Sequence, residues 1–472
     1  MDTEVQTGRA GRKRRGGPRK KTGCATCKAR HTRCDERMPT CLNCERLSLE
    51  CRPSEFISHS SWNNAGSATR TVDELVSESL QIQPWPSRPP NTLQDPGKKL
   101  DLHPDNGNSG ASELSPPRMQ PPLPTVVLRD EAVRLLTIFR RGLATWMDIF
   151  DFNETYQRKV CQRAIHSYLI LYSICAFTAK HISLLPSGGK WQQTASYYYG
   201  EALQCLIVAL NDVQSDHDGD ELTASMLLGS YEVISASKGP HYSFYKGSMN
   251  LIQSRSISAT SSGVNRANFF IYVRHGITIA LAREKSLQFD PKDWNMPPLE
   301  QIGSGEDELG NYLLWISAKV VDLIYSQDAV SADRKSLMGM TDCWYRRTES
   351  MRGVSYGDVD DEGLQKMFFA VPAAAAAMLW YNLTRLLLLA EPTLLDSASK
   401  ELVEKHVKSI LEIAISRITP NVYCFAIMPV YFAGKHTTDV SRKLRAYSIL
   451  DEIQREVGYS TRDQMQALSV AI

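Results

Sequence analysis

The sequence predicts a small metal-stabilised α-helical module, then a disordered linker, then a large all-α domain. Three observations predict this order. Six of the 11 cysteines lie between Cys24 and Cys51. The segment that follows is rich in Ser, Pro, Asn and Gly. From about Leu128 onward, apolar residues recur at three- and four-residue steps, while strand-like alternation is nearly absent. A hydrophobic content of 42% in 472 residues is enough for at least one large core.

The charge of the chain is concentrated at one end. The whole chain carries a net charge of only +2, but residues 9–52 contain 14 Lys and Arg against 4 Asp and Glu. Residues 53–472 are left with a net charge of −6. A basic head on a mildly acidic body is the asymmetry expected when one end of a protein meets a polyanion.

Residues 1–23 are predicted to form a basic disordered arm. They contain no apolar core, so they do not resemble a secretory signal, and a reducing compartment is expected, in which disulfides are rare. The two basic runs favour a nuclear import signal, an arm that grips DNA, or both, with a solvated tail as the alternative. The residues of these runs are Arg12, Lys13, Arg14, Arg15, Arg19, Lys20 and Lys21.

Residues 52–127 are predicted to form a Ser/Pro-rich linker, because their composition cannot bury enough apolar surface to become ordered. One short helical pattern, TVDELVSESLQI at residues 71–82, places Val72, Val76 and Leu80 on one face. It lasts barely two heptads, which is fewer than a coiled coil needs. An isolated, mostly unformed helix is therefore favoured, and both a monomer and a homodimer stay open.

Residues 128–472 are predicted to form one all-α domain of about ten to fourteen helices. The segment 158–185 is apolar on nearly all sides, which predicts a central helix. Gly458 is predicted to end a late helix in the left-handed conformation. The apolar segment 367–390 is predicted to be a buried helix that starts at Pro372, and not a membrane span, because Asn382 and Arg385 interrupt it.

The six clustered cysteines form an internal repeat. The unit C-x2-C-x6-C occurs twice, as CATCKARHTRC and CLNCERLSLEC. Each C-x2-C pair can chelate one ion, as in structural zinc sites. Two tetrahedral zinc ions need eight bonds, and six sulfurs supply eight only if two of them bridge. The symmetry of the repeat makes its first cysteines, Cys24 and Cys41, the natural bridging pair. The predicted metal ligands are Cys24, Cys27, Cys34, Cys41, Cys44 and Cys51.

Other uses of six cysteines fit less well. A disulfide framework needs an oxidising compartment, for which nothing in the sequence argues. An iron–sulfur site usually takes four cysteines. A zinc deaminase needs H-x-E and P-C-x-x-C elements, and both are missing here because His31 is not followed by x-Glu and Thr40 separates Pro39 from Cys41. A binuclear structural zinc site is therefore predicted.

The two halves of the repeat differ in charge. Between Cys27 and Cys34 lie four basic or imidazole side chains and no acid, whereas the second half has a net charge of −1 between its last two cysteines. Only the first half can approach phosphates without repulsion. The residues predicted to contact DNA are Lys28, Arg30, His31 and Arg33. Plain phosphate attraction is the alternative for each of them, and it is favoured for Lys28 and Arg33.

This stretch resembles the fungal Zn(2)-Cys(6) binuclear cluster, a DNA-binding domain of transcription factors. All five gaps between cysteines are in the family's range, and Pro39 lies two residues before the fourth cysteine. The resemblance implies that the first and fourth cysteines bridge two Zn²⁺ ions. It also implies reading of CGG triplets in double-stranded DNA, with Arg30 and His31 at base edges and Lys28 and Arg33 nearer the backbone. Some members have Lys where this chain has His31, and a preference for guanines is expected.

The helical region resembles, less specifically, the fungal-specific regulatory domain that accompanies such clusters. The stretches that carry this resemblance are FRRGLATWMDIFD, YVRHGITIALARE around Arg274, and MPVYFAGK. It implies a nuclear regulator of transcription that binds co-regulators and governs a metabolic or secondary-metabolite gene set. No residue of the domain is assigned a function by this resemblance.

No catalytic motif is found in the helical region: it has no P-loop, no G-x-S-x-G and no H-E-x-x-H. The histidines at 166, 181 and 275 are interpreted as ordinary surface or core residues. The remaining cysteines are interpreted as core residues, namely Cys161, Cys175, Cys205, Cys343 and Cys424. We therefore expect a sequence-specific DNA-binding regulator and not an enzyme. The alternative is a helical scaffold or enzyme that carries a zinc module for protein contacts.

Overall fold

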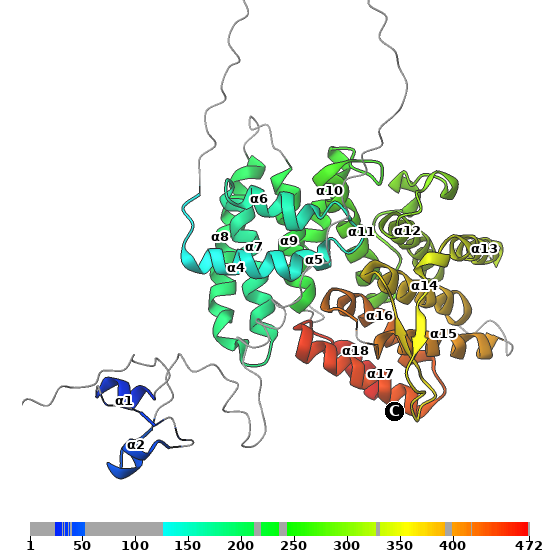
Figure 1. Cartoon of the computed structure of the whole chain (residues 1–472). Helices are drawn as coiled ribbons and strands as arrows, with labels where there is room; N and C mark the ends of the chain where they lie inside the picture. Colours follow the sequence, from blue (N-terminus) through cyan, green and yellow to red (C-terminus); the bar gives the residue numbers. More distant parts are fainter. Residues whose placement is uncertain are drawn as a thin grey trace, which may run out of the picture. The chain divides into compact units, whose positions relative to one another are not determined.

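The computed structural model describes residues 24–30, 32, 34–35, 37, 40–51, 126–211, 219–235, 243–326, 331–391, 399–416 and 418–470. The chain forms two compact units, Met1–Thr69 and Arg70–Ile472 (Figure 1). The predicted basic arm and the helical segment at 71–82 lie outside the described residues. The predictions of a disordered arm and a linker therefore stay predictions.

In the first unit, two five-residue helices repeat the symmetry of the sequence. Helix α1 (Ala25–Ala29) follows Cys24 directly, and α2 (Leu42–Arg46) follows Cys41 directly. Cys41 caps α2, since its side chain accepts a hydrogen bond from the Cys44 N–H. Helices this short are not stable by themselves, so their geometry depends on what their cysteines hold.

The second unit is a bundle of helices. Among its described residues there are fifteen α-helices: α4 (Asp130–Arg141), α5 (Leu143–Met147), α6 (Cys161–Ala164), α7 (Tyr168–Leu184), α8 (Gln192–Asn211), α9 (Asp220–Ser235), α10 (Ser243–Ser254), α11 (Gly263–Arg283), α12 (Glu306–Tyr325), α13 (Ser331–Arg347), α14 (Pro372–Ala390), α15 (Ser399–Ala414), α16 (Pro420–His436), α17 (Val440–Glu452) and α18 (Arg462–Ser469). The expected number was slightly low because α5 and α6 are too short to show helical periodicity.

A small hairpin departs from the all-α expectation. Strands β1 (Val354–Tyr356) and β2 (Lys366–Phe368) pair antiparallel, with Val354 opposite Phe368. Neither strand has a buried face, so the hydrophobic alternation that signals a strand is missing from the sequence. The hairpin is a surface addition to a helical domain.

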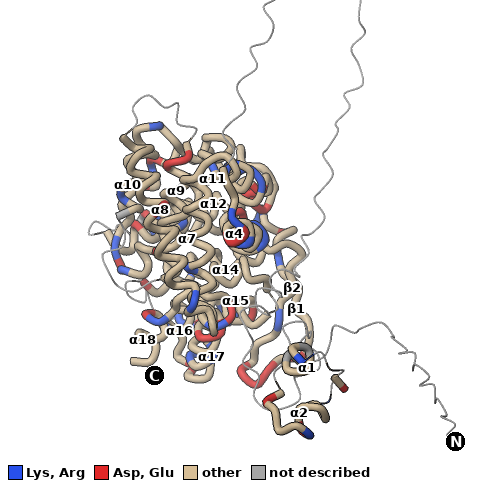
Figure 2. The backbone as a smooth tube through the Cα atoms, turned by 90° about the vertical axis from the view of Figure 1, so that its left-hand side faces the viewer, with Lys and Arg blue, Asp and Glu red and all other residues tan. Residues whose placement is uncertain are grey.

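Helix α7 is central, as predicted, and packs against α4, α8 and α9. Lys180 is the one Lys, Arg, Asp or Glu in this helix, so the tube is almost entirely tan along α7 in Figure 2. The segment 158–185 is not one continuous helix, however. The backbone N–H of Ile170 donates to the Ser167 hydroxyl, which caps a new helix at Tyr168.

Helix α14 is a buried helix that begins at Pro372, as predicted. It is the one helix of the described residues that is long and apolar enough to cross a membrane, but 94% of its most apolar window is buried within the fold. It packs against α12, α15 and α16. Its polar side chains have partners there: Asn382 donates to the Met378 carbonyl at 2.8 Å, and Arg385 contacts Asp342 at 2.6 Å. These contacts explain how a core helix tolerates both residues.

Gly458 ends the π-helical turn Ile453–Val457 with φ +65°, as the sequence predicted. A side chain at this position would also meet a neighbouring segment: a Cβ atom would lie 3.0 Å from Leu185 and 3.2 Å from the His181 carbonyl oxygen. Both the backbone conformation and the close approach therefore require glycine.

Candidate metal centre and nucleic-acid interface

The sulfur atoms of the six clustered cysteines gather into two groups of four. One group is Cys24, Cys27, Cys34 and Cys41, and the other is Cys24, Cys41, Cys44 and Cys51. Within each group, all sulfurs lie within 4.8 Å of one another. The two groups share Cys24 and Cys41, the first cysteine of each repeat unit. The geometry thus pairs the two residues that the symmetry of the sequence had singled out.

The sulfur–sulfur distances suit tetrahedral zinc. Cys24 lies 3.8 Å from both Cys41 and Cys44, and Cys27 lies 3.6 Å from Cys41. A tetrahedron with metal–sulfur bonds of about 2.3 Å has sulfur–sulfur edges of about 3.8 Å. A disulfide needs about 2.05 Å between its sulfurs, so these pairs are not disulfides, and all eleven cysteines are free.

Backbone amides support the sulfurs in the same way in both halves. The Cys27 N–H donates to Cys24 at 3.3 Å, and the Cys44 N–H donates to Cys41 at 3.4 Å. Likewise, the Cys24 N–H donates to Cys34 and the Cys41 N–H to Cys51, both at 3.4 Å. N–H donors stabilise negative charge on sulfur, and outer hydrogen bonds of this kind orient metal ligands. The repeat in sequence is therefore also a repeat in hydrogen bonding.

The protonation of the buried thiols also fits a metal centre. Burial raises the pKa of the Cys44 thiol to about 12, and burial likewise raises the pKa of Cys24 and of Cys27. Burial acts in the same direction on Cys41, but hydrogen bonds from the Cys44 amide and from neighbouring thiols lower its pKa to about 6. Since thiolates are costly in this site without a cation, a dication that displaces the protons stabilises the whole group.

Loops between the helices are fixed by a few polar contacts. The Thr26 hydroxyl donates to the Glu50 carbonyl at 2.7 Å, which ties α1 to the end of the second half. The Leu42 N–H donates to the Asp35 carboxylate at 3.2 Å at the start of α2. Arg37 and Glu45 pair at 3.2 Å but are both more than half exposed, so this pair adds little stability.

The residues predicted to contact DNA are only partly described. Lys28 belongs to α1, and Arg30 is exposed directly after that helix. His31 and Arg33 lie outside the described residues, so their geometry is not known. The second half of the repeat exposes Leu42, Leu47 and Leu49 instead of a basic set. The role of the first half in DNA contact therefore stays a prediction.

The second unit corrects one prediction about its cysteines. Cys161 and Cys175 are buried, and Cys205 and Cys424 are partly buried, but Cys343 is exposed on α13. Its neighbour Trp344 is fully buried, so the apolar sequence around Cys343 reflects the opposite side of the same helix. Cys343 is therefore not a core residue.

Two of the three histidines in question are part of the interior, and one is not. The ring of His181 is hydrogen-bonded through Nε2 to the Val457 carbonyl at 2.8 Å and lies edge-on to Trp146. His275 lines a cavity described below, and His166 is exposed. Arg274 lines the same cavity. This cavity was not predicted from the sequence, because the residues that line it come from segments far apart in the chain.

Two family models match the chain. A family model described as "Fungal specific transcription factor domain" matches residues 134–468, and one described as "Fungal Zn(2)-Cys(6) binuclear cluster domain" matches residues 22–60. No solved structure matches the chain.

Individual relatives match over short stretches. White-opaque regulator 2 of Candida albicans is 58% identical over 33 residues, which are 7% of each chain. Transcription activator AMTR1 of Alternaria alternata is 45% identical over 63 residues, 13% of this chain and 8% of that protein. Transcriptional activator protein UGA3 of Saccharomyces cerevisiae is 27% identical over 173 residues, 35% of this chain and 30% of that protein. The chain thus spans less than a third of each relative's length.

The family match and the geometry agree on the metal. Six soft thiolates, arranged at tetrahedral edge lengths and supported by amide donors, make a zinc-binding set. Since the first family model covers well over half of the chain, the protein belongs to the fungal specific transcription factor domain family, and residues 22–60 are its fungal Zn(2)-Cys(6) binuclear cluster domain.

Proposed function

We propose that this protein is a sequence-specific DNA-binding regulator of genes transcribed by RNA polymerase II, that it acts in the nucleus, and that it is not an enzyme. Its zinc domain holds two Zn²⁺ ions, bridged by Cys24 and Cys41. One observation carries this proposal: two groups of four sulfurs share those two cysteines, and the helix of only one half continues into basic residues. A saturated thiolate cluster leaves no open metal position for catalysis, so its role is to hold shape.

The zinc count can be measured directly. Elemental analysis of the purified full chain is expected to give two zinc ions per chain. A Cys51→Ser variant removes a ligand of one sulfur group only, whereas Cys41→Ser removes a ligand of both. We therefore expect Cys41→Ser to lose more zinc than Cys51→Ser. Equal loss in the two variants contradicts the bridging role of Cys41.

DNA recognition is assigned to the first half of the repeat. Arg30 and His31 are proposed to read the guanines of CGG-type triplets in the major groove, where O6 and N7 accept hydrogen bonds. Lys28 and Arg33 are proposed to contact phosphates, which adds affinity without sequence information. The basic residues from Arg12 to Lys21 are proposed to serve nuclear import and to add grip on DNA.

The test compares specific and scrambled duplexes across a salt series. The full chain is titrated with a CGG-containing duplex and with a scrambled one, followed by fluorescence anisotropy. Arg30→Ala and His31→Ala are expected to weaken CGG binding by about 1–3 kcal/mol each and to relax discrimination. Lys28→Ala is expected to weaken both duplexes equally and to reduce the salt slope by about one.

A matched control is available in the second half of the repeat. Arg46→Ala in α2 removes the same charge from the acidic half and is expected to leave discrimination unchanged. Equal affinity for both duplexes at physiological salt contradicts a sequence-specific regulator. It favours instead a scaffold whose zinc domain makes protein contacts. Homodimer formation and binding of co-regulators by the helical domain stay predictions.

A further inference from the structure

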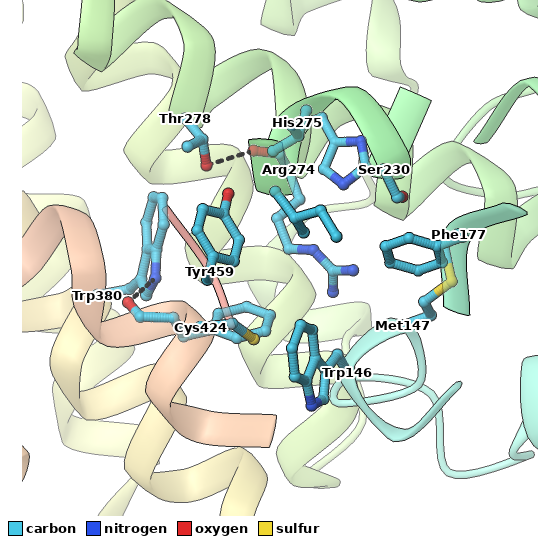
Figure 3. Close-up of a pocket in the computed structure, with 13 residues that line it drawn as sticks. Trp146, Met147, Phe177, Ser230, Arg274, His275, Thr278, Trp380, Cys424 and Tyr459 are labelled. Atoms are coloured by element: carbon cyan, nitrogen blue, oxygen red, sulfur yellow. Dashed lines mark hydrogen bonds between the residues drawn. The ribbon is translucent and has the colours of Figure 1, made fainter. Parts of the chain in front are cut away.

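The helical domain contains a cavity, partly open to solvent, that the proposed function does not use. Its volume is about 70 Å³, and its walls come from α5, α7, α9, α11, α14 and α16 (Figure 3). Most of the lining is apolar or aromatic, including Trp146, Phe177, Trp380 and Phe425. Since one water occupies roughly 10–15 Å³ on such a measure, the space accommodates several waters. A cavity of about 150 Å³ is needed to hold benzene, so a ligand with an aromatic body would have to extend through the open side.

One cation lies in the middle of this apolar lining. The guanidinium group of Arg274, from α11, extends between the rings of Phe177, Trp146 and Tyr459 in Figure 3. It lies 4.9 Å from the centre of the Phe425 ring, a cation–π contact. Among the residues that the structure describes, no carboxylate forms an ion pair with it and no side chain or carbonyl accepts a hydrogen bond from it. Burial lowers the pKa of Arg274, which reflects the cost of this charge.

The neighbouring acid is engaged elsewhere. The Asp148 carboxylate accepts hydrogen bonds from the backbone N–H groups of Tyr156 and Gln157, both at 2.9 Å. Burial raises the pKa of Asp148 to about 7, so at neutral pH this carboxyl group is not a full counter-charge for Arg274. The other charged candidate in the lining, His275, has its pKa lowered to about 3 by burial and by repulsion from Arg274, and is neutral. Arg274 is therefore the one charged side chain among the described residues that line the cavity.

This combination selects a ligand chemistry. Arg274 is partly buried, and a desolvated cation without a carboxylate partner among the described residues costs free energy that an anion entering the cavity recovers. A planar guanidinium matches a carboxylate with two parallel hydrogen bonds. Since the described lining contains a single cation, a monoanion balances it, whereas a phosphate dianion leaves an excess charge in an apolar site. The aromatic walls add affinity for a flat apolar body.

We propose that this cavity binds a small monocarboxylate with a flat apolar body, whose carboxylate pairs with Arg274 and whose body packs between the aromatic walls. Residues of α5, α11 and α16 line the cavity together, so the ligand joins segments that are far apart in the chain. A ligand that binds only the folded domain also stabilises it, in proportion to its concentration relative to Kd. The site lies within the helical domain and is independent of whether the zinc domain reads CGG triplets.

The test uses the full chain with defined probes. Benzoate and phenylacetate are the carboxylate probes, benzamide is the neutral analogue of benzoate, and inorganic phosphate is the anion without an apolar body. Binding is followed by calorimetry and by the thermal midpoint of the helical domain. We expect the carboxylates to bind and to raise the midpoint, and benzamide to bind at least about tenfold more weakly, because it lacks the charge-assisted pair.

Variants on α11 separate the cavity from general effects. Arg274→Gln removes the charge and is expected to weaken benzoate binding about tenfold or more, whereas Arg274→Lys keeps the charge and is expected to retain part of the affinity. Arg266→Gln is the matched control, since Arg266 makes the same kind of contact with Phe270, at 5.0 Å, but does not line the cavity. It is expected to bind benzoate like the unchanged chain.

Several outcomes overturn the proposal. They are the absence of binding by both carboxylates at millimolar concentration, equal affinity for benzoate and benzamide, tighter binding of phosphate than of benzoate, and equal effects of Arg274→Gln and Arg266→Gln. If Arg274→Gln does not fold, the probe comparison on the unchanged chain and Arg274→Lys still decide. None of these results depends on DNA binding, so a failure here is distinct from a failure of the proposed function.

Discussion

The two units of this chain are ordered by different physical means. In the zinc domain, the buried apolar cluster consists of Cys24, Cys27, Cys41 and Cys44, with the two remaining cysteines packed against it. In the helical domain, one large cluster of aliphatic and aromatic side chains fills the interior, with residues such as Leu135 and Phe432 fully buried. One part of the chain is therefore stabilised by metal ligation, and the other by the removal of apolar surface from water.

The larger apolar side chains that the structure describes in the zinc domain do not form a core. Leu42, Leu47 and Leu49 are exposed by 53%, 44% and 37%, so these three cannot replace the metal. Domains this small usually need disulfides or metals to fold. The helical domain differs in both respects. Its core is a large apolar cluster, and no group of potential metal ligands is found among its described residues.

Zinc removal is expected to have the largest effect and to separate the two units. A chelator such as EDTA should unfold the zinc domain and abolish DNA binding, since structural zinc contributes on the order of 10–16 kcal/mol to folding in zinc-finger peptides. The thermal unfolding of the helical domain should not change. Tryptophan fluorescence reports mainly on the helical domain, because residues 128–472 contain six Trp, whereas residues 24–51 contain none and Trp62 is the one Trp of the first unit.

Cysteine variants supply the control for this experiment. Cys41→Ser should reproduce the effect of the chelator on DNA binding, whereas Cys343→Ser, at an exposed position on α13, should have none. Loss of the helical domain's thermal transition on chelation would mean that zinc also holds that domain together, and the contrast between the units would fail.

A substitution that creates a new cavity in the helical core is expected to destabilise the helical domain and to leave the zinc domain unchanged. Leu386 on α14 is fully buried, so Leu386→Ala should destabilise the helical domain by about 2–5 kcal/mol, through lost burial and the cavity left behind. Leu402→Ala on α15 is the matched control, since Leu402 is 46% exposed, and its effect should stay within about 0.5 kcal/mol.

Chemical denaturation followed by tryptophan fluorescence measures both variants, and elemental analysis follows the zinc content. The zinc content of Leu386→Ala should not change, because its effect belongs to the other unit. If Leu386→Ala and Leu402→Ala lower the free energy of unfolding equally, the difference in burial between these two leucines is contradicted.

The difference between the units also explains what could be predicted from sequence. The zinc ligands lie within 28 residues, and their spacing alone encodes the two sulfur groups, so Cys24 and Cys41 could be paired by counting. Helix positions followed from periodicity in the same way, because periodicity is local. Local signals such as a capping glycine were also readable, as Gly458 illustrates.

Features that depend on distant segments could not be predicted. Arg274 has an ordinary place in a helical sequence, and only the tertiary packing of α5, α11 and α16 leaves its guanidinium without a carboxylate partner among the described residues. The prediction that Cys343 is a core residue was wrong for a related reason. Apolar neighbours in the sequence do not decide which face of α13 is buried. The break before α7 was missed because one side-chain cap at Ser167 outweighs a continuous apolar pattern.

The smallest of the three effects is expected from the titration of a single buried histidine, and acidification separates the units again. Burial lowers the pKa of His181 and of His406 from 6.5 to about 4, and that of His275 to about 3. Because the folded-state pKa lies below the unfolded one, the folded domain prefers neutral imidazole. The stability that these histidines contribute is fully present above pH 6.5 and is lost as the pH falls through about 4.

The buried carboxyl group of Asp148 acts in the opposite direction. Burial raises its pKa to about 7, so its contribution to stability is lost as the pH rises through that value and is present in acid. Burial also raises the pKa of Asp307, Asp322 and Glu452. Burial acts in the same direction on Glu391, but hydrogen bonds from His436 and Lys435 outweigh it and lower its pKa. The three imidazoles carry larger shifts than these four carboxyl groups, so the free energy of unfolding of the helical domain should fall on acidification. Each histidine is expected to contribute on the order of 1–3 kcal/mol to this fall.

A histidine variant tests the origin of the acid response. The ring of His406 is hydrogen-bonded through Nδ1 to the Asn382 amide oxygen at 2.8 Å, and His406→Gln keeps a donor there while removing the titration. Denaturation curves of the full chain at a series of pH values should show a flatter pH dependence for His406→Gln than for the exposed-site control His166→Gln. Parallel curves for the two variants would place the acid sensitivity outside the buried imidazoles. The zinc domain should respond separately, through protonation of its thiolates and release of zinc, and this change is followed by DNA binding.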